Sequence, residues 1–112
     1  MAATLAGLAL AAAGCAGGPD PDSAEPVATT EVEMPRSYRF DPVAIEVDAG
    51  SEVTWTNEDS FTHTVKLEDG PDTSDHRVGR GDSVTLTFDT AGTYHYVCTL
   101  HPRDMKGVVV VR

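Results

Sequence analysis

Apolar residues recur at every second position in short runs along this chain, and that spacing constrains the fold more than any other feature. Val53 and Trp55 alternate with threonines, as Val84, Leu86 and Phe88 do. Period-two alternation places one face of a strand against a core and the other in solvent. Such runs occupy residues 31–34, 45–48, 53–56, 63–67, 84–88, 94–98 and 108–111, separated by clusters of Asn, Asp, Gly and Pro. No stretch has the spacing of a helix, so the sequence predicts an all-β sandwich of about seven strands.

The inward faces of these runs supply the expected core. Apolar residues make up 40% of the 112 residues, which is enough for one compact domain. We expect the tryptophan and the tyrosines of the strands to fill this core rather than to bind a ligand. The predicted core consists of Ile45, Val47, Val53, Trp55, Val65, Leu67, Leu86, Phe88, Tyr94 and Tyr96.

The N-terminal segment has the pattern of an export signal. Residues 2–13 are small and apolar, too few to span a bilayer but typical of the apolar part of a secretory signal. The run Ala12-Ala13-Gly14-Cys15 resembles the lipobox of bacterial and archaeal lipoproteins, in which the cysteine becomes the lipidated first residue. We therefore expect a signal peptide at 1–14, a lipidated Cys15 with a flexible tether at 15–28, and a folded domain at 29–112.

The charge of the chain limits its partners. Asp and Glu number 18 against 8 Lys and Arg, which gives a formal charge of −10 at pH 7. Repulsion between this charge and phosphates excludes a nucleic acid as the partner. A protein with a cationic surface is the partner that the acidity favours.

The residues that carry chemistry gather near the C-terminus. Cys98, His101 and Met105 supply a thiol, an imidazole and a thioether within eight residues, a spacing that suits a tight loop between two strands. Soft sulfur ligands together with imidazole favour copper. A second imidazole has to come from elsewhere, and His63 is the candidate because it opens a strand directly after a turn-forming segment. A disulfide between Cys15 and Cys98 is the alternative use of the two cysteines.

The two other histidines of the chain are expected outside the metal site. His95 lies on the opposite strand face from Cys98, which predicts a surface position. His76 lies in a polar stretch between residues 72 and 82, which predicts a solvated side chain.

The motifs resemble those of the cupredoxins, in the branch that contains plastocyanin, amicyanin and halocyanin. The resemblance is carried by Thr54-Trp55-Thr56-Asn57-Glu58-Asp59, His63-Thr64-Val65, Gly92-Thr93-Tyr94-His95-Tyr96-Val97-Cys98, His101-Pro102 and Met105-Lys106-Gly107. It implies a Greek-key β-sandwich of seven to eight strands with one type 1 copper ion per chain. His63, Cys98 and His101 would form the trigonal plane around the copper, with Met105 as a long axial ligand.

Three further residues are expected to support these ligands. Thr64 follows the first histidine, and its hydroxyl can tie that strand to the ligand loop. Asn57 belongs to the matched run that precedes the same histidine. Leu100 stands where relatives often have a proline. Because proline has no N–H, we expect the Leu100 amide to donate to the Cys98 sulfur and to raise the reduction potential.

Together these expectations predict an extracytoplasmic electron carrier, not an enzyme, held by its lipid at the outer face of the cytoplasmic membrane. Its partners would be a redox protein donor and acceptor, such as a cytochrome or a membrane oxidase. Three alternatives stay open: copper storage or delivery without redox traffic, a copper oxidase or nitrite reductase unit, and a structural zinc site. Storage proteins tend to offer several Met or His in open sites, and copper enzymes need histidines for a second centre.

Overall fold

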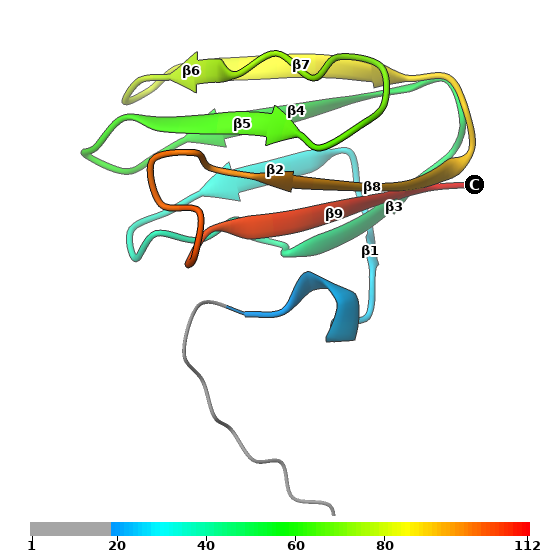
Figure 1. The fold of residues 1–112 in the computed structure, drawn as a ribbon, viewed down its shortest axis with the longest axis horizontal. Helices are drawn as coiled ribbons and strands as arrows, with labels where there is room; N and C mark the ends of the chain where they lie inside the picture. The colour runs from blue at the N-terminus through cyan, green and yellow to red at the C-terminus, as the bar shows by residue number, and fades with distance from the viewer. Residues whose placement is uncertain (1–18) are drawn as a thin grey trace, which may run out of the picture.

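Two β-sheets packed face to face form the fold in the computed structural model, which describes residues 19–112 (Figure 1). The larger sheet has six strands in the order β1-β3-β9-β8-β5-β6, and the smaller has three in the order β2-β4-β7. The all-β sandwich that the sequence predicts is confirmed, with nine strands among the described residues. Their bounds are β1 Val27–Ala28, β2 Glu31–Met34, β3 Ala44–Val47, β4 Ser51–Asn57, β5 His63–Leu67, β6 His76–Val78, β7 Ser83–Phe88, β8 Gly92–Val97 and β9 Lys106–Val111.

The two strands beyond the predicted seven are β1 and β6, at the two edges of the larger sheet. β1 pairs in parallel with β3, with Val27 opposite Ile45, and begins two residues before the predicted domain boundary. A short 3-10 helix, η1 (Pro21–Ser23), precedes it, and Pro21 is buried. Residues 21–28 thus contact the domain through the buried Pro21 and the pairing of β1 with β3, although most of them are exposed, and the tether predicted for 15–28 stays a prediction. The signal segment 1–14 and Cys15 lie outside the described residues.

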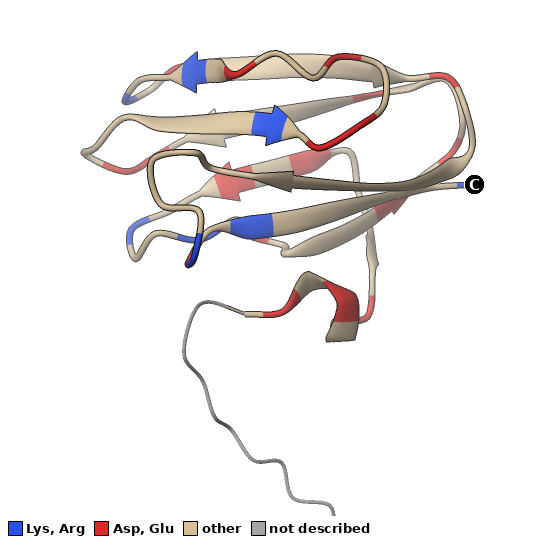
Figure 2. Cartoon of the chain, in the orientation of Figure 1, with Lys and Arg blue, Asp and Glu red and all other residues tan. Residues whose placement is uncertain are grey.

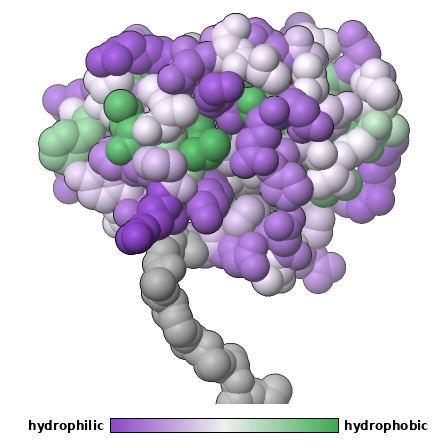
Figure 3. Space-filling view, in the orientation of Figure 1, coloured by the Kyte–Doolittle hydropathy of each residue, from purple (hydrophilic) through white to green (hydrophobic). Residues whose placement is uncertain are grey.

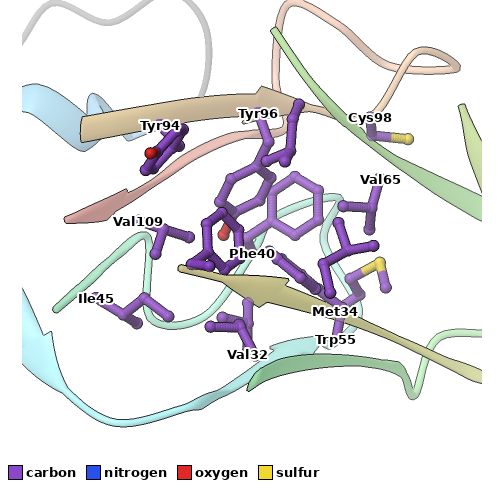
Figure 4. Close-up of a cluster of buried hydrophobic side chains, with 14 of the residues drawn as sticks. Val32, Met34, Phe40, Ile45, Trp55, Val65, Tyr94, Tyr96, Cys98 and Val109 are labelled. Carbon is purple, nitrogen blue, oxygen red and sulfur yellow. The ribbon is translucent and has the colours of Figure 1, made fainter. Parts of the chain in front are cut away.

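The core lies between the two sheets, and all ten residues predicted for it are buried. Trp55 on β4 and Tyr96 on β8 meet edge to face, with ring centroids 5.2 Å apart, and Phe40 contacts the same tyrosine at 4.7 Å. Figure 4 shows these rings filling the space between the sheets, with Tyr94 and Tyr96 on β8 and Cys98 directly after its end. Cys98 therefore stands at the edge of a rigid aromatic core.

The strand directions place four loops at one end of the sandwich, on the left in Figure 1. These loops cover residues 35–43, 58–62, 79–82 and 98–105, and we call this end the His63 end. In the loops at the opposite end, acidic residues outnumber basic ones. They include Glu68, Asp69, Asp72 and Asp89 in the loops around β6 and β7, where Figure 2 shows red segments. The His63 end carries both signs of charge, because four arginines lie in its loops among the acids.

Candidate metal centre

The loop between β8 and β9 holds three of the four predicted metal ligands. It begins at Cys98 directly after β8 and ends at Met105 directly before β9. Backbone hydrogen bonds close it: the Cys98 amide donates to the Met105 carbonyl at 3.0 Å, and the Met105 amide donates to the His101 carbonyl at 3.0 Å. Cys98 and Met105 are fully buried. The loop therefore has a fixed shape, and both sulfur-bearing side chains belong to the core.

His63 reaches the same place from the neighbouring strand. It is the first residue of β5, it is fully buried, and its Nδ1 lies 3.9 Å from the Cys98 Sγ. Nitrogen and sulfur ligands with bonds of about 2.0 and 2.3 Å to one ion, at a trigonal angle, are about 3.7 Å apart. The observed separation therefore fits two ligands that share one metal ion.

His101 lies beside this pair but closer to the surface. Its ring is half-buried, and the ring centroids of His101 and His63 are 5.5 Å apart. In the part of the chain that the structure describes, no three His, Cys, Asp or Glu side chains are already grouped as a metal cluster. The structure thus brings His63 and Cys98 to ligand spacing, with His101 adjacent to them and Met105 buried in the same core.

The Cys98 sulfur accepts a hydrogen bond from the backbone of the neighbouring strand. The Thr64 amide donates to it at 3.3 Å. The Thr64 hydroxyl also accepts from the Thr99 amide at 2.7 Å, so this residue ties β5 to the start of the ligand loop. The donation from the Leu100 amide to the same sulfur stays a prediction, and the Leu100 side chain is exposed.

Asn57 holds the loop that leads into His63. It is fully buried, and its Nδ2 donates to the Phe61 carbonyl at 2.8 Å and to the Val78 carbonyl at 2.9 Å. Its Oδ1 accepts from the Asp59 amide at 2.8 Å. Three hydrogen bonds from one buried side chain fix the path of residues 58–62 and therefore the position at which β5 begins.

The other two histidines each pair with an aspartate. His76 Nε2 pairs with Asp72 Oδ2 at 3.0 Å, and His95 Nε2 pairs with Asp22 Oδ1 at 2.7 Å. Both histidine side chains are partly exposed, at 26% and 37%. The side-chain contacts of both rings are with these aspartates and not with Cys98 or His63.

Comparison with known proteins identifies the family. Residues 27–112 match the model of copper-binding proteins of the plastocyanin/azurin family. The chain belongs to this family. It is 36% identical to amicyanin-alpha of Methylorubrum extorquens over 99% of this chain and 95% of that protein. Its fold matches the amicyanin of Paracoccus versutus with a TM-score of 0.67 and 26% identity, over 80% of this chain and 87% of that one.

Part of a copper enzyme also matches the fold. A copper-containing nitrite reductase of Thermus scotoductus superposes with a TM-score of 0.66 and 31% identity, over 83% of this chain but only 26% of the reductase. The cupredoxin resemblance seen in the motifs is confirmed, and the cofactor of this cupredoxin is a single type 1 copper ion. A buried thiol, two imidazoles and a thioether at one end of the sandwich are the ligand set that copper prefers.

Sequence reasoning missed two aromatic residues beside the ligands, Tyr38 and Phe61. Tyr38 packs against His101 with a centroid separation of 4.5 Å and stacks on Phe61 at 6.1 Å. Tyr38, Phe61 and Leu100 are exposed, and Figure 3 shows residues of high hydropathy on the surface toward this end of the cupredoxin. Their sequence neighbours are polar turn residues, so only the fold brings these side chains together.

The buried carboxylate of Asp59 was also missed. Its Oδ2 lies 2.8 Å from His63 Nε2, and the residue is 4% exposed. Burial raises the pKa of Asp59, but hydrogen bonds from His63 and from the Ser60 and Phe61 amides outweigh it and leave the pKa below the ordinary value. An acid four residues before a ligand histidine was the signal in the sequence.

Proposed function

We propose that this cupredoxin carries single electrons between a redox protein donor and a redox protein acceptor, with copper held by His63, Cys98, His101 and Met105. The observation that carries the proposal is the 3.9 Å separation of His63 Nδ1 and Cys98 Sγ inside a fully buried site. Bound there, copper would supply one-electron oxidation and reduction between its two oxidation states.

The part of the protein in this function is to keep the ligands still. His63 is fixed by the start of β5, and Cys98 by the end of β8. The Thr64 hydroxyl and the Cys98–Met105 backbone bond hold these two segments and the loop together. Ligands that cannot rearrange favour electron transfer, because little structural change then separates the two oxidation states.

The surface around His101 supports an exchange of electrons with other proteins. His101 is half-buried, and the exposed side chains of Tyr38, Phe61 and Leu100 lie at the same end. An exposed apolar patch of this kind marks a site of protein contact. Acidic residues outnumber basic ones in the loops at the opposite end of the sandwich. The patch itself therefore carries no strong field of one sign, which suits partners of either charge.

For its location we propose the outer face of the cytoplasmic membrane, with the chain held through a lipid on Cys15. The support is the apolar run at 2–13 and the lipobox-like Ala12-Ala13-Gly14-Cys15, all of which precede the described residues. Among residues 19–112 no helix is long and apolar enough to cross a membrane. Globomycin treatment of the host, which blocks lipoprotein processing, tests this part: the account expects the unprocessed precursor to accumulate.

The alternatives fit the residues less well. The amicyanin and plastocyanin relatives are electron carriers and not enzymes. The nitrite reductase is almost four times as long as the part of it that this chain matches. A second copper centre would need the remaining histidines, but His76 and His95 lie on different strands and each pairs with an aspartate. A storage site would be open and labile, whereas here His63, Cys98 and Met105 are fully buried.

Optical and EPR spectra of the copper-reconstituted protein test the proposal. We expect an intense blue or green absorption that ascorbate bleaches and ferricyanide restores through repeated cycles. His76→Gln is the matched control, because it removes a histidine outside the site, and it should keep both the colour and the cycling. A colourless copper-loaded protein would favour storage, and a preference for zinc with no coloured copper form would favour a structural site.

A further inference from the structure

The loop after β4 places a buried carboxylate against the back of the first copper ligand. Asp59 Oδ2 lies 2.8 Å from His63 Nε2, and the side chains of the two residues are 6% and 0% exposed. The other carboxylate oxygen, Oδ1, accepts from the Ser60 amide at 2.6 Å. A buried carboxylate is costly unless it is paired and hydrogen-bonded, and here both oxygens have partners.

The surroundings of Asp59 fix its orientation independently of any metal. Its amide donates to Asn57 Oδ1 at 2.8 Å, and the same asparagine donates to the Phe61 carbonyl at 2.8 Å. The carboxylate thus belongs to a hydrogen-bonded loop that holds it in one orientation. A buried carboxylate needs donors at its oxygens, and when ionised it can only accept hydrogen bonds.

This arrangement decides which nitrogen of His63 carries the hydrogen. An ionised carboxylate at 2.8 Å requires a hydrogen on Nε2. In the neutral imidazole the lone pair then lies on Nδ1, the nitrogen that faces Cys98 Sγ at 3.9 Å. The ring is therefore oriented and in the correct tautomer for metal binding before any ion arrives.

We infer that Asp59 is a positioning residue that presents Nδ1 of His63 to the copper and that its negative charge favours the oxidised ion, which lowers the reduction potential. The inference rests on the proposed function, because it takes His63 as a copper ligand. A carboxylate behind a ligand histidine raises the basicity of the ring, and a more basic ligand stabilises the more highly charged ion.

The chain contains a matched pair that lacks this role. Asp72 and His76 have the same spacing of four residues and the same atoms in contact, Oδ2 and Nε2, at 3.0 Å. Their side chains are 37% and 26% exposed, and neither residue is among the expected copper ligands. Asp72→Asn therefore removes the same unit of charge and the same kind of contact as Asp59→Asn, but outside the copper site.

The first test needs no copper. Nitrogen-15 NMR of the copper-free protein near neutral pH should place the His63 hydrogen on Nε2, with an N–H signal that exchanges slowly with water. Asp59→Ala should lose the slow exchange, whereas Asp59→Asn should keep it in part, because an amide oxygen still accepts. A wild-type hydrogen found on Nδ1 would overturn the positioning role.

The second test separates charge from hydrogen bonding. Loss of a residue that supports a metal ligand typically weakens metal binding about 10–100-fold. We expect Asp59→Asn to weaken binding of the oxidised ion by about tenfold more than binding of the reduced ion, which corresponds to a rise of about 59 mV in reduction potential. Asp59→Glu should recover part of the difference, and Asp72→Asn should leave the potential at the wild-type value.

Two results distinguish the failures. If the wild-type protein is blue and Asp59→Asn has the wild-type reduction potential, the charge of Asp59 does not tune the copper, whatever the stability of the variant. The proposed function as an electron carrier is not affected by that result. If wild type never forms a coloured copper site, the proposed function itself fails. Thermal unfolding of each copper-free variant shows whether it is folded, and the isosteric Asn variant serves if the Ala variant is not.

Discussion

The close approach of Tyr96 to Gly107 predicts that Gly107→Ala lowers the free energy of unfolding, although replacing glycine by alanine in a strand usually raises it. The two residues lie directly opposite each other on β8 and β9. A Cβ added at Gly107 would meet the tyrosine ring, with Cε1 at 2.8 Å and Cζ and the hydroxyl oxygen still closer, whereas real Cβ contacts essentially never fall below 3.0 Å. The ring has no room to retreat, because it is 1% exposed and packed against Trp55 and Phe40.

The magnitude follows from two opposed effects. Gly107 has a backbone conformation that other residues adopt, so Gly107→Ala would normally stabilise the fold by about 0.4–1 kcal/mol through the unfolded chain. Overpacking of a full core costs about 1–3 kcal/mol. We therefore expect a net loss of about 1–2 kcal/mol in the free energy of unfolding. At about 4–8 °C per kcal/mol for a domain of this size, Tm should fall by about 4–16 °C.

Thermal and urea unfolding of the copper-free protein measure this effect. Gly79→Ala is the matched control, because its Cβ would meet only the end of the Asp82 side chain, at 3.0 Å, which is exposed and can move. The control should be neutral or slightly stabilised. Gly107→Ala as stable as wild type, or more stable, would refute the packing argument and with it the explanation for glycine two residues after Met105.

Three further predictions concern single contacts. Thr64→Val removes the acceptor of the Thr99 amide and should lower the free energy of unfolding of the copper-free protein by about 1–3 kcal/mol in urea; an unchanged value would mean that the bond is not formed in solution. Leu100→Pro removes the expected amide donor to the Cys98 sulfur and should lower the potential in voltammetry, so an unchanged or higher potential removes the idea. Hydrogen bonds from the Ser74 amide and hydroxyl hold the pKa of Asp72 below 3.8. Because the pKa of Asp72 is lower in the folded protein than in the unfolded chain, its contribution to stability is present above about pH 4 and is lost as the pH falls through the folded pKa. In urea unfolding, the wild-type protein should therefore be more stable than Asp72→Asn at about pH 7 but not well below about pH 4. An equal difference at both pH values would contradict this.

Alternation was a sufficient signal for the long strands but not for the short ones. The run 63–67 coincides with β5, because a polar break precedes it and five residues show the pattern. β1 and β6 have two and three residues, which is too few for a period to be visible. Their positions depend on pairing with β3 and β5 and are therefore properties of the whole sheet.

The site divides in the same way between local and distant information. Cys98, His101 and Met105 could be proposed together because one loop carries them. The support around them could not, because it is built from contacts between segments. Tyr38 reaches His101 from a loop some 60 positions earlier, and Asp59 becomes a partner of His63 only when the loop after β4 folds back on itself. The polar sequence around Tyr38 and Asp59 predicts turns at these positions, but the partners of the two side chains are determined only by the folded structure.

X-ray absorption at the copper edge counts the atoms bound to the metal, and it therefore shows whether the Cys98 sulfur and two imidazoles bind the copper. We expect one short copper–sulfur bond and two copper–nitrogen bonds in the wild-type protein, with the short sulfur bond absent in Cys98→Ser. A spectrum with only nitrogen and oxygen neighbours, or a short sulfur bond that persists in Cys98→Ser, would contradict it.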